Sequence, residues 1–454
     1  MTKLVHDLPA GTLEWVESIG SGKVSQLRRH VARREAWVVD VTRPDGTTLE
    51  GFLRVQRESD SVDPRRLERE TRILQALQDT EVPVPAVYGW NADLKAALFE
   101  RDPGRSDLDK LEDTTQQRAV MEDFTRIVAK LHTLDINALA LEDIMQYVPT
   151  TPAECALNEV DLIVSQWQRF IDRQLDPLTI YSLDWLRRYA PTTVSRTSLI
   201  QGDTGPVNFM FQGDRVSAVI DWELGHFGDP LEDLGNIAVR EFWNPSGGLS
   251  GLFDLYEAES GIAYDRFRAQ YYAVHQNVRG MMPIHYVCEN AHPQESLAWY
   301  LAYRYVGDRA TCEMLAAAME VSIAPPDFPK DDDPRDILAK SAIYALEHDV
   351  APTLSDPFAQ SRTKDAQTLI ACMARKRRFG PELEAAELEE LSSLLGIEAV
   401  SIADSRRAFQ RAVAEGRLED DAVIRTLTAK AYRDEWLYRP STDLYPDRSW
   451  APFD

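Results

Sequence analysis

The sequence predicts an α+β fold in which a β-rich segment precedes a mainly helical segment and a further helical region. Residues 12–102 contain short apolar or alternating runs separated by turn residues, which is typical of strands. Helical periodicity dominates from 103 onward, apart from one β-rich island at 198–223. We therefore expect an N-terminal lobe over 1–102 and a helical C-terminal lobe over 103–322. A linker over 323–336 and a helical region of unknown role over 337–454 follow.

The composition indicates a folded protein that avoids polyanions. The chain has 454 residues, 44% of them hydrophobic, and a formal net charge of −24. Such a charge repels nucleic acid and anionic membrane, so we expect neither as a partner. Four widely spaced cysteines fit reduced thiols. No apolar stretch approaches the length of a spanning helix, so we expect a soluble, cytoplasmic protein. A homodimer is left open.

The N-terminal elements follow from turn signals and spacing. A short strand is expected over 13–19. The runs WVVDVTRP (37–44) and LEGFLRVQ (49–56) flank Asp45-Gly46, a strong hairpin signal. Asp63-Pro64 then opens the amphipathic stretch PRRLERETRILQALQ, which predicts a helix. The segments VPVPAVYGW and AALFERD predict two more short strands.

The remaining elements are predicted from helical periodicity and proline content. VMEDFTRIVAKLHTLD and VDLIVSQWQRFIDRQL each predict a helix. The segment 323–336 combines four prolines with an acidic run, which is typical of a linker. Four or five amphipathic helices are expected over 335–436. The last residues are rich in aromatic side chains, so we expect this tail to pack on the body of the protein.

The island at 198–223 carries the residues most typical of chemistry. An apolar strand leads to Asp203, Asn208 follows five residues later, and Asp221 stands thirteen residues after Asn208, beyond a hairpin turn at Gly213-Asp214. A loop and hairpin of this kind can bring two carboxylates and one carboxamide together. Phosphoryl transfer needs such a set, because one Asp orients the attacking hydroxyl while an Asp and an Asn bind Mg²⁺. An Asx-rich turn with solvated carboxylates is the alternative.

The wider pattern resembles the aminoglycoside phosphotransferase-like (choline kinase-like) family of small-molecule kinases. The stretch QGDTGPVNFMF…VIDWELGHFGDPLEDL is similar to the family's His-Gly-Asp-x-x-x-x-Asn, Ile-Asp-Trp-Glu and Gly-Asp-Pro-x-x-Asp-Leu motifs. AKLHTLD, VPVPAVYGW and RETRIL match upstream segments in the expected order. The resemblance covers roughly 12–322 and implies a two-lobed, protein-kinase-like fold. It does not extend to the helical region after the linker.

The resemblance implies roles for residues at matching positions. Asp203 would be the catalytic base or hydroxyl-orienting group, and Asn208 and Asp221 would hold Mg²⁺. The family's usual His is Gln201, which we expect to support the loop by hydrogen bonds. Arg54 replaces the family's lysine and would pair with nucleotide phosphates and with Glu70. An Arg here resembles the metabolic branch related to acyl-CoA-dehydrogenase-linked kinases.

Two further nucleotide contacts are expected. The segment from Gly20 through Gly22 to Ser25 would cover the ATP phosphates, since small residues let backbone N–H groups approach them. Glu100, within Phe99-Glu100-Arg101, would lie in the hinge that binds adenine through main-chain groups. His132, Asp229 and Asp233 are interpreted as structural residues.

The leading hypothesis is an ATP-dependent kinase that phosphorylates a hydroxyl group of a small molecule. The Arg-type strand favours a catabolic substrate such as a hydroxy acid or hydroxyacyl-CoA. Phosphorylation of an aminoglycoside or another antibiotic is the second hypothesis. A nucleotide-binding pseudokinase is the third, because Gln201 and Arg54 both depart from the family pattern.

Overall fold

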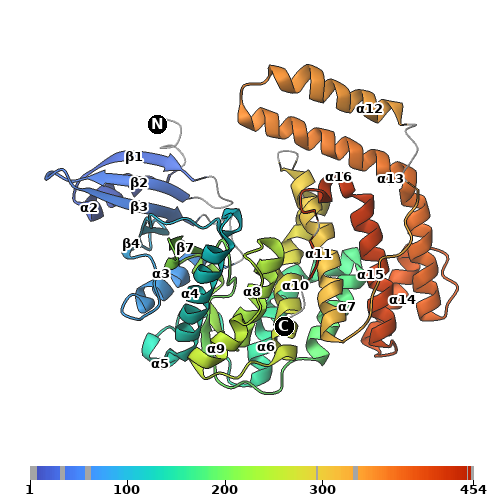
Figure 1. Cartoon of the computed structure of the whole chain (residues 1–454), viewed down its shortest axis with the longest axis horizontal. Coiled ribbons are helices and arrows are strands. Elements are labelled where there is room, and N and C mark those ends of the chain that lie inside the picture. The colour runs from blue at the N-terminus through green and yellow to red at the C-terminus, as the bar shows by residue number, and fades with distance from the viewer. Residues whose placement is uncertain are drawn as a thin grey trace. The chain divides into compact units, whose positions relative to one another are not determined.

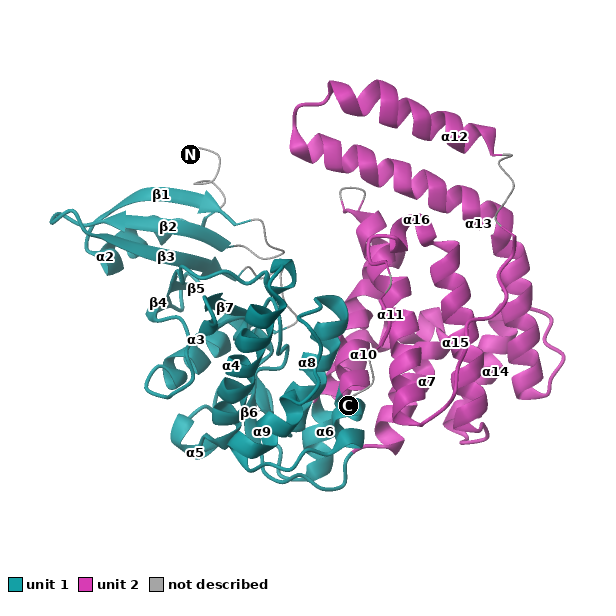
Figure 2. Cartoon of the chain, viewed as in Figure 1, with its two compact units in different colours: residues 1–158, 191–272, 453–454 teal, residues 159–190, 273–452 magenta. Residues whose placement is uncertain are grey.

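The computed structural model describes residues 8–30, 36–56, 63–292, 295–330, 336–446 and 448–450. The chain divides into two compact units (Figure 2). Unit 1 comprises residues 1–158, 191–272 and 453–454, and unit 2 comprises 159–190 and 273–452. Two long helices, α6 (Pro152–Gln174) and α10 (Arg266–Asn290), begin in unit 1 and end in unit 2. The units are therefore not cut at the linker that the sequence predicts.

Unit 1 begins with the predicted β-rich lobe, drawn in blue in Figure 1. Its five strands form one sheet in the order β1-β2-β3-β5-β4, with antiparallel pairing throughout. Their bounds are β1 (Lys23–Arg29), β2 (Ala36–Thr42), β3 (Thr48–Val55), β4 (Val87–Asn91) and β5 (Ala96–Glu100). The hairpin at Asp45-Gly46 is confirmed, because β2 pairs with β3 from Thr42↔Thr48 onward. Helix α3 (Arg66–Leu77) confirms the amphipathic stretch.

The strand expected over 13–19 is wrong. These residues lie in helix α2 (Thr12–Gly20), which ends with Ser21 in the left-handed conformation. Val16 is fully buried in the core of the sheet, and Leu13 and Ile19 pack beside it. Apolar residues three positions apart share one helical face, whereas a short apolar run alone does not separate helix from strand. Packing of the apolar side chains on the sheet therefore favours the helix over the strand.

The rest of unit 1 is mainly helical and holds the β-rich island. The island forms two antiparallel pairs, β6 with β9 and β7 with β8. Helix α4 packs against α9 and contacts β6 and β8. The elements are α4 (Thr114–Thr133), α5 (Ile136–Leu139), β6 (Ser198–Ile200), β7 (Phe209–Gln212), β8 (Arg215–Val219), β9 (His226–Gly228), α8 (Leu231–Trp243) and α9 (Leu252–Ser260).

Unit 2 is helical, as the periodicity predicts. Helix α15 packs against α11 and α13, and α14 packs against α13 and α7. The aromatic tail packs back on this unit: Trp450 is 9% exposed, and its backbone N–H donates to Glu313. The helices are α7 (Pro177–Arg188), α11 (Leu297–Ala318), α12 (Ile337–Tyr344), α13 (Pro357–Leu395), α14 (Ile402–Ala414), α15 (Asp420–Leu437) and α16 (Arg439–Thr442).

Two general expectations can be compared with the structure. All four cysteines are free, and burial raises the pKa of the Cys155 thiol to about 11, which keeps it protonated. Within the described ranges, no helix combines the length and apolar character needed to cross a bilayer. The stretch 323–330 has no helix or strand, and the acidic part of the predicted linker, 331–335, lies outside the described residues.

Candidate active site

A cavity of about 740 Å³ in unit 1 gathers most of the residues to which the sequence assigns chemistry. Apolar side chains from the sheet, including Val38, Phe52 and Phe99, line one part of it. Its polar lining contains six carboxylates and four guanidinium groups from distant parts of the chain: Arg28, Arg54, Glu70, Glu100, Arg101, Asp102, Asp203, Asp221, Glu223 and Arg240. An apolar part of the lining beside a charged part suits a nucleotide, because the base and the phosphates need different surroundings.

Asp203 and Asn208 are held together by the loop that joins β6 to β7. The Asn208 amide Nδ2 donates to the backbone carbonyl of Asp203, 2.6 Å away, and to its carboxylate Oδ2, 2.9 Å away. The loop makes this tight turn with Gly202 at φ 84° and Gly205 at φ 137°, conformations that favour glycine. The Asn208 carboxamide therefore has both donors engaged, which leaves its oxygen as the group able to bind a cation.

Asp221 lies next to Asn208 across the β7–β8 hairpin. The N–H of Ile220 donates to the Asn208 carbonyl at 3.0 Å, and Asp221 adopts a left-handed φ of 59°. Both side chains line the cavity, and that of Asp221 is 38% exposed. One carboxylate and one carboxamide oxygen fit the usual protein share of a Mg²⁺ site, in which phosphate and water supply the other ligands.

Gln201 connects the two loops, as the sequence predicts for a supporting residue. Its Nε2 donates to the carbonyls of Ile220 and Asp221 at 3.0 and 2.9 Å. Its Oε1 accepts from the N–H of Asp203 at 2.8 Å and from the hydroxyl of Thr204 at 3.1 Å. The Gln201 side chain itself is buried, with 1% of the residue exposed. The carboxamide thus fixes the Asp203 loop relative to Asp221.

Asp233 also holds the loop that carries Asp203, through hydrogen bonds to its first residues. Its carboxylate accepts from the N–H groups of Gln201 and Gly202 at 3.0 and 3.1 Å and from the Thr204 hydroxyl. His132 Nε2 lies 3.0 Å from it, while His132 Nδ1 bonds the Tyr256 hydroxyl at 2.8 Å. Burial alone would raise the pKa of Asp233, but the bonds from His132, Thr204 and Gln201 lower it below its ordinary value. The structural interpretation of His132 and Asp233 agrees with these contacts.

Asp229 is a second buried carboxylate near the start of α8. It accepts from the N–H of Leu231 at 3.0 Å and from the Tyr272 hydroxyl at 3.2 Å, and it pairs with Arg268 at 3.3 Å. Burial raises the pKa of Asp229 to about 6, against the opposing effect of Arg268. It does not line the cavity, in agreement with a structural role.

Arg54 forms the ion pair with Glu70 that the resemblance implies, and it pairs with two further carboxylates. Its Nη1 lies 2.5 Å from Glu70 Oε1, and its Nη2 lies 3.2 Å from Glu223 Oε2. Asp221 Oδ1 is 3.8 Å from Nη1. Both glutamates are buried, so the guanidinium compensates two carboxylates inside the protein. Glu223 was not assigned a role from the sequence; its place in Ile-Asp-Trp-Glu, next to Asp221, was the available signal.

Arg240, on helix α8, was also missed. Its Nε donates to Asp203 Oδ1 at 3.0 Å, and its Nη2 forms an ion pair with Asp203 Oδ2. The residue lies 37 positions after Asp203, beyond the recognised motifs. Within LEDLGNIAVREFW it carries the only positive charge, which was a weak signal on its own.

Of the remaining predicted contacts, only Glu100 lies in the lining of this cavity. Gly20, Gly22 and Ser25 do not line the cavity; a side chain at Gly20 or Gly22 would instead meet β2 residues within 3 Å. Glu100 does line it, at the end of β5, but its N–H donates to the Ala86 carbonyl at 2.8 Å. An adenine contact at Glu100 would therefore use its carbonyl oxygen. The roles of these four residues stay predictions.

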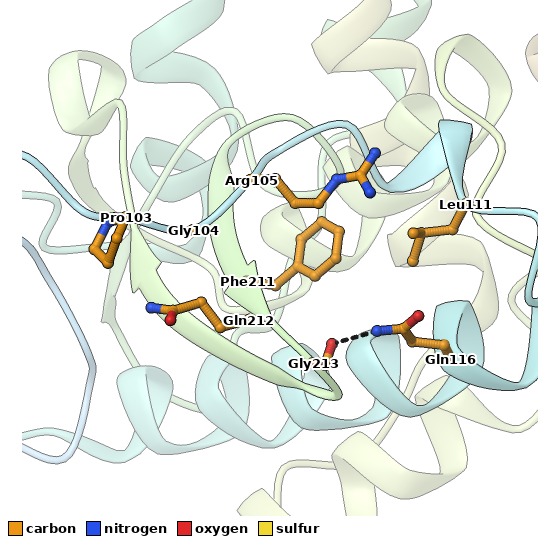
Figure 3. A pocket seen from close by; sticks show the side chains of 8 residues that line it. All are labelled: Pro103, Gly104, Arg105, Leu111, Gln116, Phe211, Gln212 and Gly213. Atoms are coloured by element: carbon orange, nitrogen blue, oxygen red, sulfur yellow. Dashed lines mark hydrogen bonds between the residues drawn. The ribbon is translucent and has the colours of Figure 1, made fainter.

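A second, smaller cavity of about 360 Å³ lies beside the β7–β8 hairpin (Figure 3). Arg105 lies over the Phe211 ring, 5.8 Å from its centroid, and Gln116 donates to the Gly213 carbonyl at 2.9 Å. No carboxylate is found among the described residues that line it. This cavity therefore lacks the acidic groups that phosphoryl transfer needs.

Comparison with known proteins agrees with this geometry. The model of the phosphotransferase enzyme family matches residues 28–273, more than half of the chain. Acyl-CoA dehydrogenase family member 11 of Rattus norvegicus is 29% identical over 188 residues, which make up 39% of this chain and 23% of that protein. Hygromycin-B 4-O-kinase of Escherichia coli is 31% identical over 104 residues, or 23% of this chain and 29% of the kinase.

The fold has a solved counterpart. A structure from Ralstonia eutropha assigned to the aminoglycoside phosphotransferases superposes with a TM-score of 0.53 and 20% identity, covering 69% of this chain and 96% of the other. This likeness shows the fold, while the matched part spans about a quarter of the curated relatives named above. From the match of its family model, the chain belongs to the phosphotransferase enzyme family.

Proposed function

We propose that the protein transfers the γ-phosphate of ATP to a hydroxyl group of a small molecule. The observation that carries this proposal is the convergence of Asp203, Asn208 and Asp221 on one cavity with the Arg54–Glu70 ion pair. A base, two oxygen ligands for a cation and a phosphate-binding guanidinium are the parts that phosphoryl transfer requires.

Each residue has a definite task in this reaction. Asp203 accepts a hydrogen bond from the substrate hydroxyl and aligns its oxygen for attack. The Asn208 amide holds the Asp203 carboxylate at 2.9 Å, so that it cannot turn away. Arg54 would bind the phosphates, while Glu70 and Glu223 fix its guanidinium. When bound by Asn208 and Asp221, Mg²⁺ supplies positive charge to the triphosphate.

A hydroxylated compound from catabolism is our first choice of substrate. Arg54 occupies the position of the family's lysine, and the first relative named above is an acyl-CoA dehydrogenase family member. A hydroxy acid or hydroxyacyl-CoA is therefore favoured. Antibiotic phosphorylation is the second choice, supported by the match to hygromycin-B 4-O-kinase, and it predicts turnover of polycationic aminoglycosides.

The decisive experiment measures ADP release over a panel of hydroxy acids, hydroxyacyl-CoA thioesters and aminoglycosides, with the wild type and Asp203→Ala. Loss of the aligning carboxylate should reduce kcat by about 10²- to 10⁴-fold and leave ATP affinity nearly intact. Asp214→Ala, an exposed change in the β7–β8 turn, is the matched control. Full activity of Asp203→Ala would refute the assignment. ATP binding without turnover on any substrate would favour the pseudokinase.

A further inference from the structure

Arg240 places a positive charge directly beside the group that would align the substrate hydroxyl. Its guanidinium bonds both carboxylate oxygens of Asp203, through Nε at 3.0 Å and through Nη2. The same guanidinium lines the cavity, and its side chain is 23% exposed. A hydroxyl that binds Asp203 therefore arrives next to a cation.

The position of Arg240 is built into the loop. Gly205 has φ 137°, and a Cβ atom there would lie 2.6 Å from Cβ and 2.9 Å from Cγ of Arg240. The glycine thus lets the stem of the arginine pass close over the backbone of the Asp203 loop. An Arg side chain has five N–H donors, and Asp203 occupies two of them. The Nη1 donors of Arg240 have no partner within the described part of the chain.

Two of the three other guanidinium groups in the cavity lining, those of Arg54 and Arg101, are held by carboxylates other than Asp203. Arg54 is bound by Glu70 and Glu223. Arg101 is bound by Asp40 and by Glu50, each at 2.8 Å. Arg240 differs because its partner is the carboxylate that the substrate must use. Asp203 also accepts from Asn208, so at least three of its roughly four lone-pair directions are engaged before a hydroxyl arrives.

We propose that Arg240 determines specificity by binding an anionic group of the substrate, a carboxylate or a phosphate, close to the hydroxyl that is phosphorylated. With one hydrogen bond to Asp203 and one to Arg240, the hydroxyl and the anionic group would bind side by side. This arrangement fits a short hydroxy acid with a free carboxylate, or a small phosphorylated alcohol. The guanidinium charge of Arg240 would repel a polycation at the same place. The proposal rests on the phosphotransferase function proposed above.

The test compares matched substrates that differ only in charge. ADP release is measured for 2-, 3- and 4-hydroxy acids, their neutral amides, glycerol phosphate and an aminoglycoside, with the wild type, Arg240→Gln and Arg240→Lys. For the preferred anion, Arg240→Gln should lower the ratio of kcat/KM on the anion to that on its neutral analogue by about 10- to 100-fold, mainly through KM, as expected for one lost charged hydrogen bond. Arg240→Lys should recover part of this ratio.

Each other outcome overturns one specific claim. An equal loss on anion and amide in Arg240→Gln, with ATP affinity and thermal midpoint retained, would mean that Arg240 only positions Asp203. Wild-type preference for amides or aminoglycosides would refute anion selection but leave the phosphotransferase function standing. The hydroxy acid and glycerol phosphate arms separate carboxylate from phosphate recognition. No turnover of any compound in this panel would refute the anion proposal, whereas the phosphotransferase function would be refuted only if the hydroxyacyl-CoA thioesters of the first panel were not turned over either.

Discussion

Gln201 offers the sharpest test of how the loop that carries Asp203 is held, because one buried side chain makes four hydrogen bonds that join two loops. Gln201→Ala removes all four. The Thr204 hydroxyl keeps its bond to Asp233, while two carbonyls and the Asp203 N–H lose their side-chain partner. At about 1 kcal/mol for each lost bond, the free energy of unfolding should fall by about 3 kcal/mol.

Urea unfolding followed by tryptophan fluorescence measures this loss. With an m-value of about 3 kcal/mol/M, the midpoint of the transition that reports unit 1 should fall by about 1 M. The kcat on the best substrate of the ADP-release panel should fall as well, since Asp203 and Asp221 are no longer fixed relative to each other. Gln201→His can keep one donor and one acceptor, so its urea midpoint and its kcat should lie between those of Gln201→Ala and the wild type.

Gln117→Ala is the matched control. Gln117 is also a buried glutamine of unit 1, and its Nε2 bonds the carbonyls of Leu108 and Leu111 at 3.1 and 3.0 Å, away from the cavity lining. The Gln117→Ala substitution should lower the free energy of unfolding by about 2 kcal/mol and leave kcat unchanged. If Gln201→Ala lost less than about 1 kcal/mol, or lost stability with wild-type kcat, Gln201 would not position the two loops.

Two further outcomes follow from the buried charges. Arg54→Ala should lower the free energy of unfolding by about 3–5 kcal/mol and raise the KM for ATP, because the buried carboxylates of Glu70 and Glu223 lose their ion pairs with Arg54; an unchanged thermal midpoint and KM would contradict this. Asp229 has a pKa of about 6 in the folded state, above its unfolded value, so it ionises earlier in the unfolded chain. Its contribution to stability should therefore fall as pH rises from about 4 to 6, and Asp229→Asn should remove about 2–3 kcal/mol of that fall. The free energies of unfolding of the wild type and of Asp229→Asn, each determined at pH 4 and pH 7, measure this difference. Parallel pH profiles would show that Asp229 does not cause the loss of stability.

Much of the candidate site was predictable because it is local. Asp203 and Asn208 share one loop, and Asp221 follows on the hairpin that the Gly213-Asp214 turn closes. A turn and a short hairpin fix such distances over a few residues, so spacing in the sequence carries the geometry. The Arg54–Glu70 pair was predictable only through the family resemblance, since strand and helix meet by tertiary packing.

The groups that complete the site were decided by the tertiary structure alone. Arg240 lies 37 positions from Asp203, and Glu223 lies 169 from Arg54. No periodicity or turn signal connects such pairs, because ion pairs between distant segments form only after helices and sheet have packed. Helix α2 was also decided by tertiary structure. Its apolar pattern fits a strand as well as a helix, and packing on the sheet favours the helix. The sequence by itself therefore determined that Asp203, Asn208 and Asp221 come together on one loop and hairpin. Packing decided which charges surround them, because those charges come from elements far apart in the chain.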